Sequence, residues 1–252
     1  MTETGVHLQY DGPIATVTLC RPAVLNAQTP ATWAALRDIG RELPGDIRMV
    51  LFRGEGRAFS AGLDRTLLAE PESFLQPLLA GSDADTAARI ESFQQGFSWL
   101  RRPDLISIAA VHGHAVGAGF QLALHCDLRV LSTDAVLSMA EITLGLVPDL
   151  GGTKRLVELV GYARAFELCA TGRQIPAAEA QQMGLAALVV PPAELDEAVA
   201  DLAGALLAAD RDAVTELKAL LLGAADRAYP AQDRAEREAQ TRLLRGRAGL
   251  SD

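Results

Sequence analysis

The chain has few cysteines, few aromatic residues and no excess of basic charge. Its three cysteines, Cys20, Cys126 and Cys169, form no CxxC pair, which disfavours a disulfide framework or a thiolate metal site. The 252 residues carry 23 Lys and Arg against 32 Asp and Glu, a formal net charge of −9. Such a balance disfavours nucleic acid as the main partner.

Long apolar runs are also missing. No stretch is long and apolar enough to span a membrane, and the N-terminus has no basic start followed by an apolar segment. We therefore expect no secretion signal, no membrane partner and a cytoplasmic protein. With 49% hydrophobic and 22% charged residues, the chain has an ordinary globular composition and enough length for one large core or two modest domains.

Period-two and helical spacings outline the first half of the chain. The patterns predict a hairpin of strands 6–10 and 14–19, then a helix starting at Thr29-Pro30 with Trp33 and Leu36 in the core. Further elements are expected as a strand at 48–52, a mobile loop or short helices at 65–84, a helix whose buried face spans 90–100, and a strand at 128–131.

Two glycine-rich turns follow apolar strands. Gly113 to Gly119 separates an apolar run at 106–111 from a helical run at 120–124, and residues 53–64 repeat this layout. Glycine permits positive φ and close approach of another molecule, and a turn entering a helix leaves free N–H groups at the positive end of its dipole. Such a turn suits an oxyanion, although an ordinary strand-to-helix turn explains the same letters.

The second half is predicted to be mainly helical from residue 163, interrupted at 171–176 and 189–192. Thr153 is expected to cap a helix beginning at Lys154, and Lys154 and Arg155 to be solvated surface charges. His112, His114 and His125 could suggest a metal cluster, but nothing supplies a further ligand at convincing spacing, so we expect no metal.

Four separate stretches resemble the crotonase (enoyl-CoA hydratase/isomerase) superfamily. In chain order they are FRGEGRAFSAGLD, AAVHGHAVGAGFQLALHCDLRV, AEITLGLVPDLGGTKRL and ATGRQIPAAEAQQMGLAALVVP. The resemblance implies an α/β fold: a crotonase-like spiral of ββα turns over residues 1–195 and a C-terminal helical trimerisation region over 196–252. It also implies an acyl thioester of coenzyme A as the substrate, no permanently bound cofactor, and a homotrimer or a hexamer built from two trimers.

The resemblance assigns an oxyanion hole to the backbone N–H groups of Leu63 and Ala118. Removing a proton beside a thioester places negative charge on the carbonyl oxygen, and losing one preorganised donor typically costs about 2.7–4 kcal/mol. Other positions are implied to contact the substrate or its CoA part, although ordinary turn chemistry explains several of them. They are Arg21, Ala23, Val24, Ser60, Ala61, Gly62, Asp64, Gly117 and Gln121.

The family's hydratases activate water with two glutamates, which would fall at Gln121 and Glu141 here. An amide cannot take up or return a proton near neutral pH. Asp149 falls where the dienoyl-CoA isomerase branch carries a catalytic aspartate, so Glu141 and Asp149 could move a double bond between them. We therefore favour isomerisation of an enoyl- or dienoyl-CoA; the alternatives are hydration and non-catalytic acyl-CoA binding.

The chain stops at Leu250-Ser251-Asp252, where family members usually continue into another helical turn that helps to cover the CoA. We therefore expect one side of the pocket to be open or to be supplied by other residues.

Overall fold

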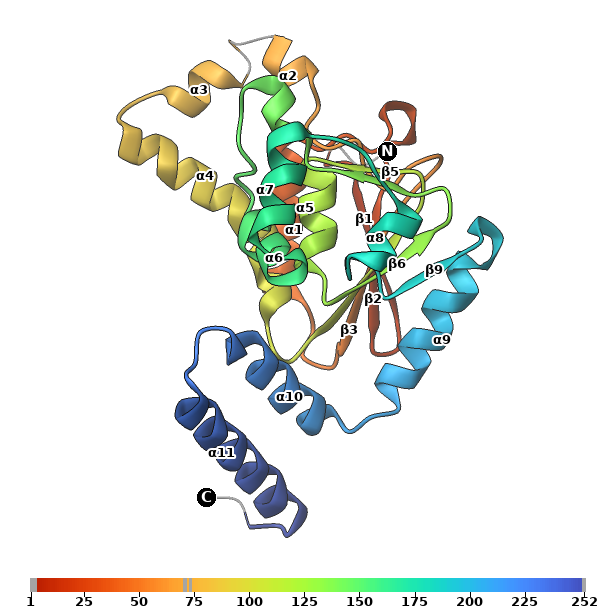
Figure 1. Cartoon of the computed structure of the whole chain (residues 1–252), viewed down its shortest axis with the longest axis vertical. Helices are drawn as coiled ribbons and strands as arrows, with labels where there is room; N and C mark the ends of the chain where they lie inside the picture. The colour runs from red at the N-terminus through yellow and green to blue at the C-terminus, as the bar shows by residue number, and fades with distance from the viewer. Residues whose placement is uncertain (1–3, 70–71, 73, 251–252) are drawn as a thin grey trace.

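The computed structural model describes residues 4–69, 72 and 74–250, and its strands form two sheets (Figure 1). The larger sheet has the order β1-β2-β3-β4-β6-β9, in which only the β1–β2 pair is antiparallel. The smaller sheet has the order β5-β7-β8. The strand bounds are β1 Val6–Asp11, β2 Ile14–Leu19, β3 Met49–Gly54, β4 Ile106–Val111, β5 His114–Val116, β6 Leu128–Ser132, β7 Val136–Ser138, β8 Ile175–Pro176 and β9 Leu188–Val190.

Helices cover both faces of the larger sheet. Among the described residues they are α1 Pro30–Glu42, α2 Thr66–Ala69, α3 Leu75–Leu79, α4 Asp83–Ser98, α5 Ala118–His125, α6 Gly152–Val160, α7 Tyr162–Thr171, α8 Ala177–Gln182, α9 Leu195–Leu207, α10 Arg211–Ala224 and α11 Tyr229–Arg247. Short 3-10 helices occur at η1 Pro22–Val24, η2 Trp99–Arg101, η3 Ala140–Leu144 and η4 Pro192–Glu194.

Two apolar layers hold these elements together. Every residue of β4 is buried, as expected of a parallel strand covered on both faces. One layer lies against α1, α4 and α5, and contains Phe52, Phe97 and Phe120. The other lies between the sheet and α9, where Val199 packs against Ile108 and its neighbours. The sheet is thus a fixed base, and the turns at its edge carry the candidate site.

Most of the predicted elements are present. The hairpin, the strands at 49–54 and 128–132 and the helix at 118–125 match the predictions, and Trp33 and Leu36 are buried. The predicted cap at Thr153 is wrong: α6 begins at Gly152, its N-cap is Gly151, and no side chain caps it. The reason is geometric, because Gly151 takes a left-handed φ of 86° that starts the helix earlier.

One glycine-rich region contains a strand that the sequence does not predict, and the segment 65–84 takes the short helices that were one of its two expectations. The turn at 113–119 contains the three-residue strand β5, which pairs with β7. Residues 65–84 contain α2, α3 and the start of α4, while positions 70, 71 and 73 of that segment lie outside the described residues.

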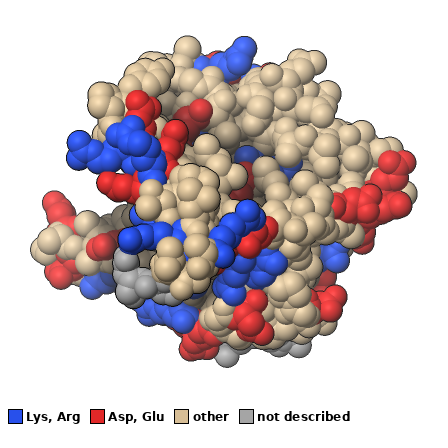
Figure 2. Space-filling model, turned by 90° about the horizontal axis from the view of Figure 1, so that it is seen from below, with Lys and Arg blue, Asp and Glu red and all other residues tan. Residues whose placement is uncertain are grey.

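The C-terminal region is helical, as predicted. The helix α9 lies along the larger sheet, and α10 packs Val214 against the same apolar layer, whereas α11 extends away from the sheet (Figure 1). On the face shown in Figure 2, acidic and basic side chains alternate with uncharged surface. Within the described residues, no helix combines the length and the apolar character needed to cross a membrane. Whether residues 196–252 form a separate unit stays a prediction.

Candidate active site

The backbone N–H groups of Leu63 and Ala118 lie near each other at the edge of the sheet. A parallel bridge joins Gln28 to Leu63: the Gln28 N–H donates to the Gly62 carbonyl (2.7 Å), and the Asp64 N–H donates to the Gln28 carbonyl (2.8 Å). Because successive amides of an extended chain point to opposite sides, the Leu63 N–H faces away from this bridge. Ala118 is the first residue of α5, so its N–H has no acceptor within the helix.

The glycine before Leu63 lets these two amides come together. Gly62 has φ +84°, and a Cβ there would lie 3.3 Å from the Ala118 nitrogen and overlap the Val116 carbonyl oxygen. Gly117 has φ 52° and ψ −120°, a conformation that only glycine adopts readily. Among the described residues, neither the Leu63 nor the Ala118 amide finds an acceptor, and both residues line one cavity.

That cavity has a volume of about 430 Å³ and is lined mainly by apolar side chains. Leu63, Ala118, Gln121, Glu141 and Asp149 all border it. The structure therefore brings together the two predicted amides, the two predicted carboxylates and the amide side chain between them. Other parts of its wall come from α1 to α4, from η3 and from the loop after η3. The residues include Trp33, Leu68, Phe74, Leu75, Leu78, Ile90, Phe93, Leu144, Leu146 and Val147.

Glu141 presents a carboxylate with one satisfied oxygen. It lies in η3, and its Oε1 accepts a hydrogen bond from Gln121 Nε2 at 2.7 Å. Its Oε2 is buried and has no hydrogen-bond partner among the described residues. Burial raises the pKa of Glu141, and the nearby negative charge of Asp149 adds to that rise, while the Gln121 hydrogen bond opposes it. A buried acceptor without a partner suits a group that exchanges a proton with a ligand.

Gln121 is completely buried and uses both ends of its amide. While Nε2 donates to Glu141, Oε1 accepts from the backbone N–H groups of Leu150 (2.9 Å) and Gly152 (3.2 Å). The turn that follows Asp149 therefore rests on α5.

The Asp149 backbone is held from two helices. Gln94 Nε2, on α4, donates to the Asp149 carbonyl at 2.6 Å, and His125 Nε2, on α5, lies 2.9 Å from the Leu150 carbonyl. Burial lowers the pKa of His125 to about 4, so the ring is neutral near pH 7 and its one N–H donates to that carbonyl. Partial desolvation at the cavity wall raises the pKa of the Asp149 carboxyl, although the residue as a whole is exposed.

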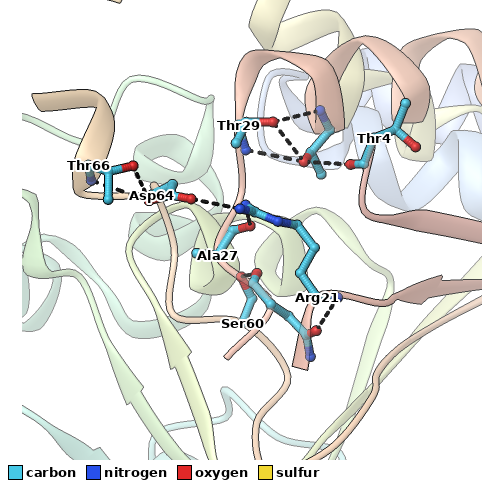
Figure 3. Close-up of polar contacts among 9 residues, drawn as sticks. Thr4, Arg21, Ala27, Thr29, Ser60, Asp64 and Thr66 are labelled. Carbon is cyan, nitrogen blue, oxygen red and sulfur yellow. Dashed lines mark hydrogen bonds and ion pairs between the residues drawn. The ribbon is translucent and has the colours of Figure 1, made fainter. Parts of the chain in front are cut away.

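Arg21 and Asp64 form an ion pair beside the Leu63 turn (Figure 3). The Arg21 guanidinium donates to Asp64 Oδ2 at 2.9 Å and to the Ala27 carbonyl at 2.7 Å. Partial burial raises the pKa of Asp64, but the hydrogen bonds from Thr66 and Arg21 together lower it by more. The pKa of Asp64 is therefore below its usual value. Ala23 and Val24 are exposed on η1.

Ser60 lies behind the site rather than on its surface. It is completely buried, and its hydroxyl donates to the Asn26 carbonyl (2.8 Å) and accepts from the Gly62 N–H (3.2 Å). This hydroxyl therefore shapes the turn that carries Leu63, whereas Ala61, its neighbour, lines the cavity.

Sequence reasoning did not identify Gln94 and His125 as site residues. His125 lies four residues after Gln121 on α5, so the two share one helix face, and this spacing is the signal that could have found it. Among the described residues, no group of three or more His, Cys, Asp or Glu is placed to hold a metal ion. His112 Nε2 lies instead 3.0 Å from the Gly56 carbonyl.

Comparison with known proteins identifies the family of the chain. The family model for enoyl-CoA hydratase/isomerase matches residues 9–247, and the chain belongs to this family of enzymes. The probable enoyl-CoA hydratase echA8 of Mycobacterium tuberculosis is 34% identical over 197 residues, which cover 77% of this chain and 72% of that protein. The peroxisomal Delta(3,5)-Delta(2,4)-dienoyl-CoA isomerase of Arabidopsis thaliana is 34% identical over 183 residues, covering 70% and 65%.

Solved structures of similar proteins have the same fold. A Thermobifida fusca YX protein, named as an enoyl-CoA hydratase and solved with acetoacetyl-CoA, shares 50% sequence identity with a TM-score of 0.91, covering 96% of this chain and 95% of that one. A second structure with the same protein name, from the same organism and solved with CoA, shares 47% sequence identity with a TM-score of 0.88. It covers 98% of this chain and 95% of that one. The predicted crotonase fold is therefore confirmed.

Proposed function

We propose that this enzyme shifts a double bond in an enoyl- or dienoyl-CoA. The observation that carries the proposal is a single apolar cavity that holds the two carboxylates Glu141 and Asp149 beside the unpaired amides of Leu63 and Ala118. The site has the parts that proton transfer along an acyl chain requires: a base, a second acid and an anion-stabilising pair of donors.

The reaction conserves the formula of the substrate. One carboxylate removes a proton from a carbon of the acyl chain, and the electron pair moves through the conjugated system onto the thioester oxygen. The Leu63 and Ala118 N–H groups stabilise that oxyanion. The other carboxyl group then returns a proton to a carbon farther along, and the electron pair re-forms the carbonyl with the double bond in its new position.

The substrate's acyl group is proposed to be apolar. Carbon side chains line most of the cavity beyond the two carboxylates, and burying an apolar chain against them is favourable by roughly 25 cal/mol for each Å² removed from water. The coenzyme A part would lie outside this cavity, along Arg21, Ala23, Val24 and the 60–64 turn.

Hydration is the second candidate, because most of the similar relatives are named enoyl-CoA hydratases. Against it stands Gln121, whose amide exchanges no proton and whose two ends are already hydrogen-bonded within the protein. A water molecule bound at Glu141 would be activated by one acid–base group, whereas the family's hydratases use two glutamates.

One incubation separates these candidates. The enzyme is given 2-enoyl-, 3-enoyl- and 2,5- or 3,5-dienoyl-CoA in deuterated water, and the products are followed by mass spectrometry. We expect an isomer that carries carbon-bound deuterium, at a rate that falls at least 100-fold in Glu141→Gln and in Asp149→Asn, which lose a general acid or base.

Glu91→Gln is the matched control, because Glu91 is exposed on α4. Water addition at an enzymatic rate would overturn the isomerase proposal in favour of hydration. Binding without any turnover would favour a non-catalytic acyl-CoA-binding protein.

We also propose that the protein assembles as a homotrimer, or as a hexamer of two trimers, in the cytoplasm, with coenzyme A entering only as part of the substrate. The exposed apolar side chains of α10 and α11, which include Leu217, Leu221 and Leu244, support assembly through these helices.

A further inference from the structure

The buried amide of Gln121 connects two elements that the chain separates. Its Nε2 donates to Glu141 in η3, and its Oε1 accepts from Leu150 and Gly152 in the turn after Asp149. We propose that Gln121 is a positioning residue, which sets the orientation of the Glu141 carboxylate and fixes the turn that carries Asp149 through one side chain. Its effect on catalysis rests on the isomerisation proposed above.

The orientation of Glu141 follows from the single hydrogen bond it receives. Because Gln121 Nε2 donates to Oε1 at 2.7 Å, the other oxygen, Oε2, is left buried without a partner. A Cβ on Gly117 would lie 3.3 Å from Oε1, so the backbone before Ala118 confines the carboxylate from a second side. Oε2 is then the oxygen free to take a proton from a ligand.

The turn is fitted to α5 at close range. A Cβ on Gly152 would lie 2.8 Å from Gln121 Cγ, and one on Gly151 would lie 3.0 Å from His125 Nε2. These two glycines let residues 149–152 approach the helix closely enough for Gln121 and His125 to hydrogen-bond Leu150 on its N–H and on its carbonyl. Asp149 is therefore anchored through its neighbour's backbone.

A glutamate at position 121 could not perform both roles. Its carboxylate could still accept from Leu150 and Gly152, but the oxygen in place of Nε2 would face Glu141 Oε1 without a proton to donate. Two carboxylates in such contact cannot both ionise readily, so the pKa of one of them rises strongly. The amide therefore satisfies an acceptor on one side and two donors on the other, which no charged side chain does.

Two substitutions separate these roles. Gln121→Glu keeps the acceptor for the turn and removes the donor to Glu141, whereas Gln121→Leu removes both. Gln182→Glu, on the exposed end of α8, adds the same charge away from the site and serves as the control.

The first readout is the protonation of Glu141, followed by carbon-13 NMR of labelled glutamate carboxyls and assigned with Glu141→Gln. In Gln121→Glu we expect one of the two contacting carboxyls, at position 141 or 121, to titrate at a pH higher than Glu141 of the wild type by on the order of one unit. The acid limb of kcat/KM should move in the same direction, with KM nearly unchanged. An unmoved titration, matching wild type and Gln182→Glu, would overturn the role of Gln121 toward Glu141.

The second readout is amide hydrogen exchange of the peptide spanning 148–153. We expect faster deuterium uptake there in Gln121→Leu and uptake close to wild type in Gln121→Glu. Equal uptake in all variants would overturn the role toward the turn. Both readouts work without turnover, so a failure of the isomerase proposal, seen as absent isomer in the deuterium assay, is distinguishable from a failure of this one.

Discussion

At the scale of single residues, the site depends on a glycine that has no room for a side chain. Gly62 has φ +84°, and an added Cβ would press on Val116 and on the Ala118 amide. We expect Gly62→Ala to move the two donors apart and to lower kcat by roughly 10²–10³, the usual effect of losing one oxyanion donor. Steady-state kinetics on the best acyl-CoA substrate measures it.

Gly12 provides a matched control for this substitution. Gly12 also has positive φ (+52°), but an added Cβ would meet no atom within 4 Å. Gly12→Ala should therefore carry the backbone strain alone, about 1 kcal/mol, with an unchanged kcat. Equal kcat in Gly62→Ala and wild type would contradict the placement of the oxyanion hole between Leu63 and Ala118.

Glu141 should lower the stability of the fold near neutral pH. Burial raises the pKa of Glu141 in the folded state, so the folded protein holds the Glu141 carboxyl proton more tightly than the unfolded chain does. The stability that this protonation contributes is lost as pH rises through the folded pKa. We expect Glu141→Gln to melt a few degrees above wild type at pH 7, since about 1 kcal/mol shifts Tm by 2–4 °C at this size.

This advantage should shrink as pH falls below the folded pKa of Glu141, and it should vanish below the lower pKa of the unfolded chain, where the carboxyl is protonated in both states. Thermal melts of both proteins across pH 4–8 test it, with Glu91→Gln as the exposed control. A Tm gain that stays constant over this range would mean that the ionisation of Glu141 costs the fold nothing.

At the scale of elements, α10 is attached to the body by a buried lysine. Lys218 donates to the carbonyls of Leu100 and Leu105 and to Asp127 Oδ2, at 2.6–2.9 Å. We expect Lys218→Met to destabilise the protein by about 3 kcal/mol, the lower end of the cost of breaking a buried ion pair. It should also open the 208–210 connection to proteolysis. Urea unfolding and limited digestion measure the two effects.

Lys154 is the comparison for Lys218, because it also pairs with an acidic residue near α10, Asp226, but is 66% exposed. Solvent screening leaves such a pair with little effect, so Lys154→Met should unfold like wild type. If both variants were equally stable, the Lys218 contacts would not be what holds α10.

Which elements the sequence could predict depends on the range of the forces that form them. The hairpin, α1 and α5 follow from local spacing and capping; Thr29, for example, forms a capping box with Thr32. The strand β5 was missed because its three residues become a strand through long-range pairing, with β7 more than 20 positions later and with Ser60 more than 50 positions earlier. The prediction of a cap at Thr153 failed because α6 begins one residue earlier, where Gly151 has a left-handed φ and the Gly152 N–H donates to Gln121 on α5.

The candidate site shows the same division. The sequence motifs predicted the site residues Leu63, Ala118, Glu141 and Asp149, and all four line one cavity in the structure. The support from Gln94 could not be predicted from sequence, since its contact with Asp149 spans 55 positions. Ser60, predicted to contact the ligand, has its hydroxyl turned into the protein instead.

At the scale of the whole molecule, the fold brings three segments that are distant in the chain to one edge of the sheet. The 60–64 turn supplies one amide, the start of α5 supplies the other, and the 141–149 segment supplies the carboxylates. Each segment is anchored by the buried layers on the sheet, so the site is preorganised by the core. Of the two C-terminal helices, α10 packs Val214 against the apolar layer beside α9, whereas α11 extends away from the core (Figure 1).

The apolar surface of these helices predicts their role in assembly. Leu217 and Leu221 lie four residues apart on one face of α10 and are 54% and 66% exposed. A charge placed there should be tolerated by the monomer and should oppose burial against another copy, because an unpaired charge is costly to bury. We expect Leu221→Asp to shift the protein from the proposed trimer to smaller species in sedimentation velocity.

Tyr10→Asp is the control, since Tyr10 is 51% exposed on the edge strand β1 and should leave the assembly intact. Sedimentation of Leu221→Asp as wild type would place the interface elsewhere, and a monomeric wild type would refute the proposed assembly. If dissociation occurs while isomerisation per chain is retained, the cavity is complete within one protomer; if activity falls with dissociation, a neighbouring copy contributes to it.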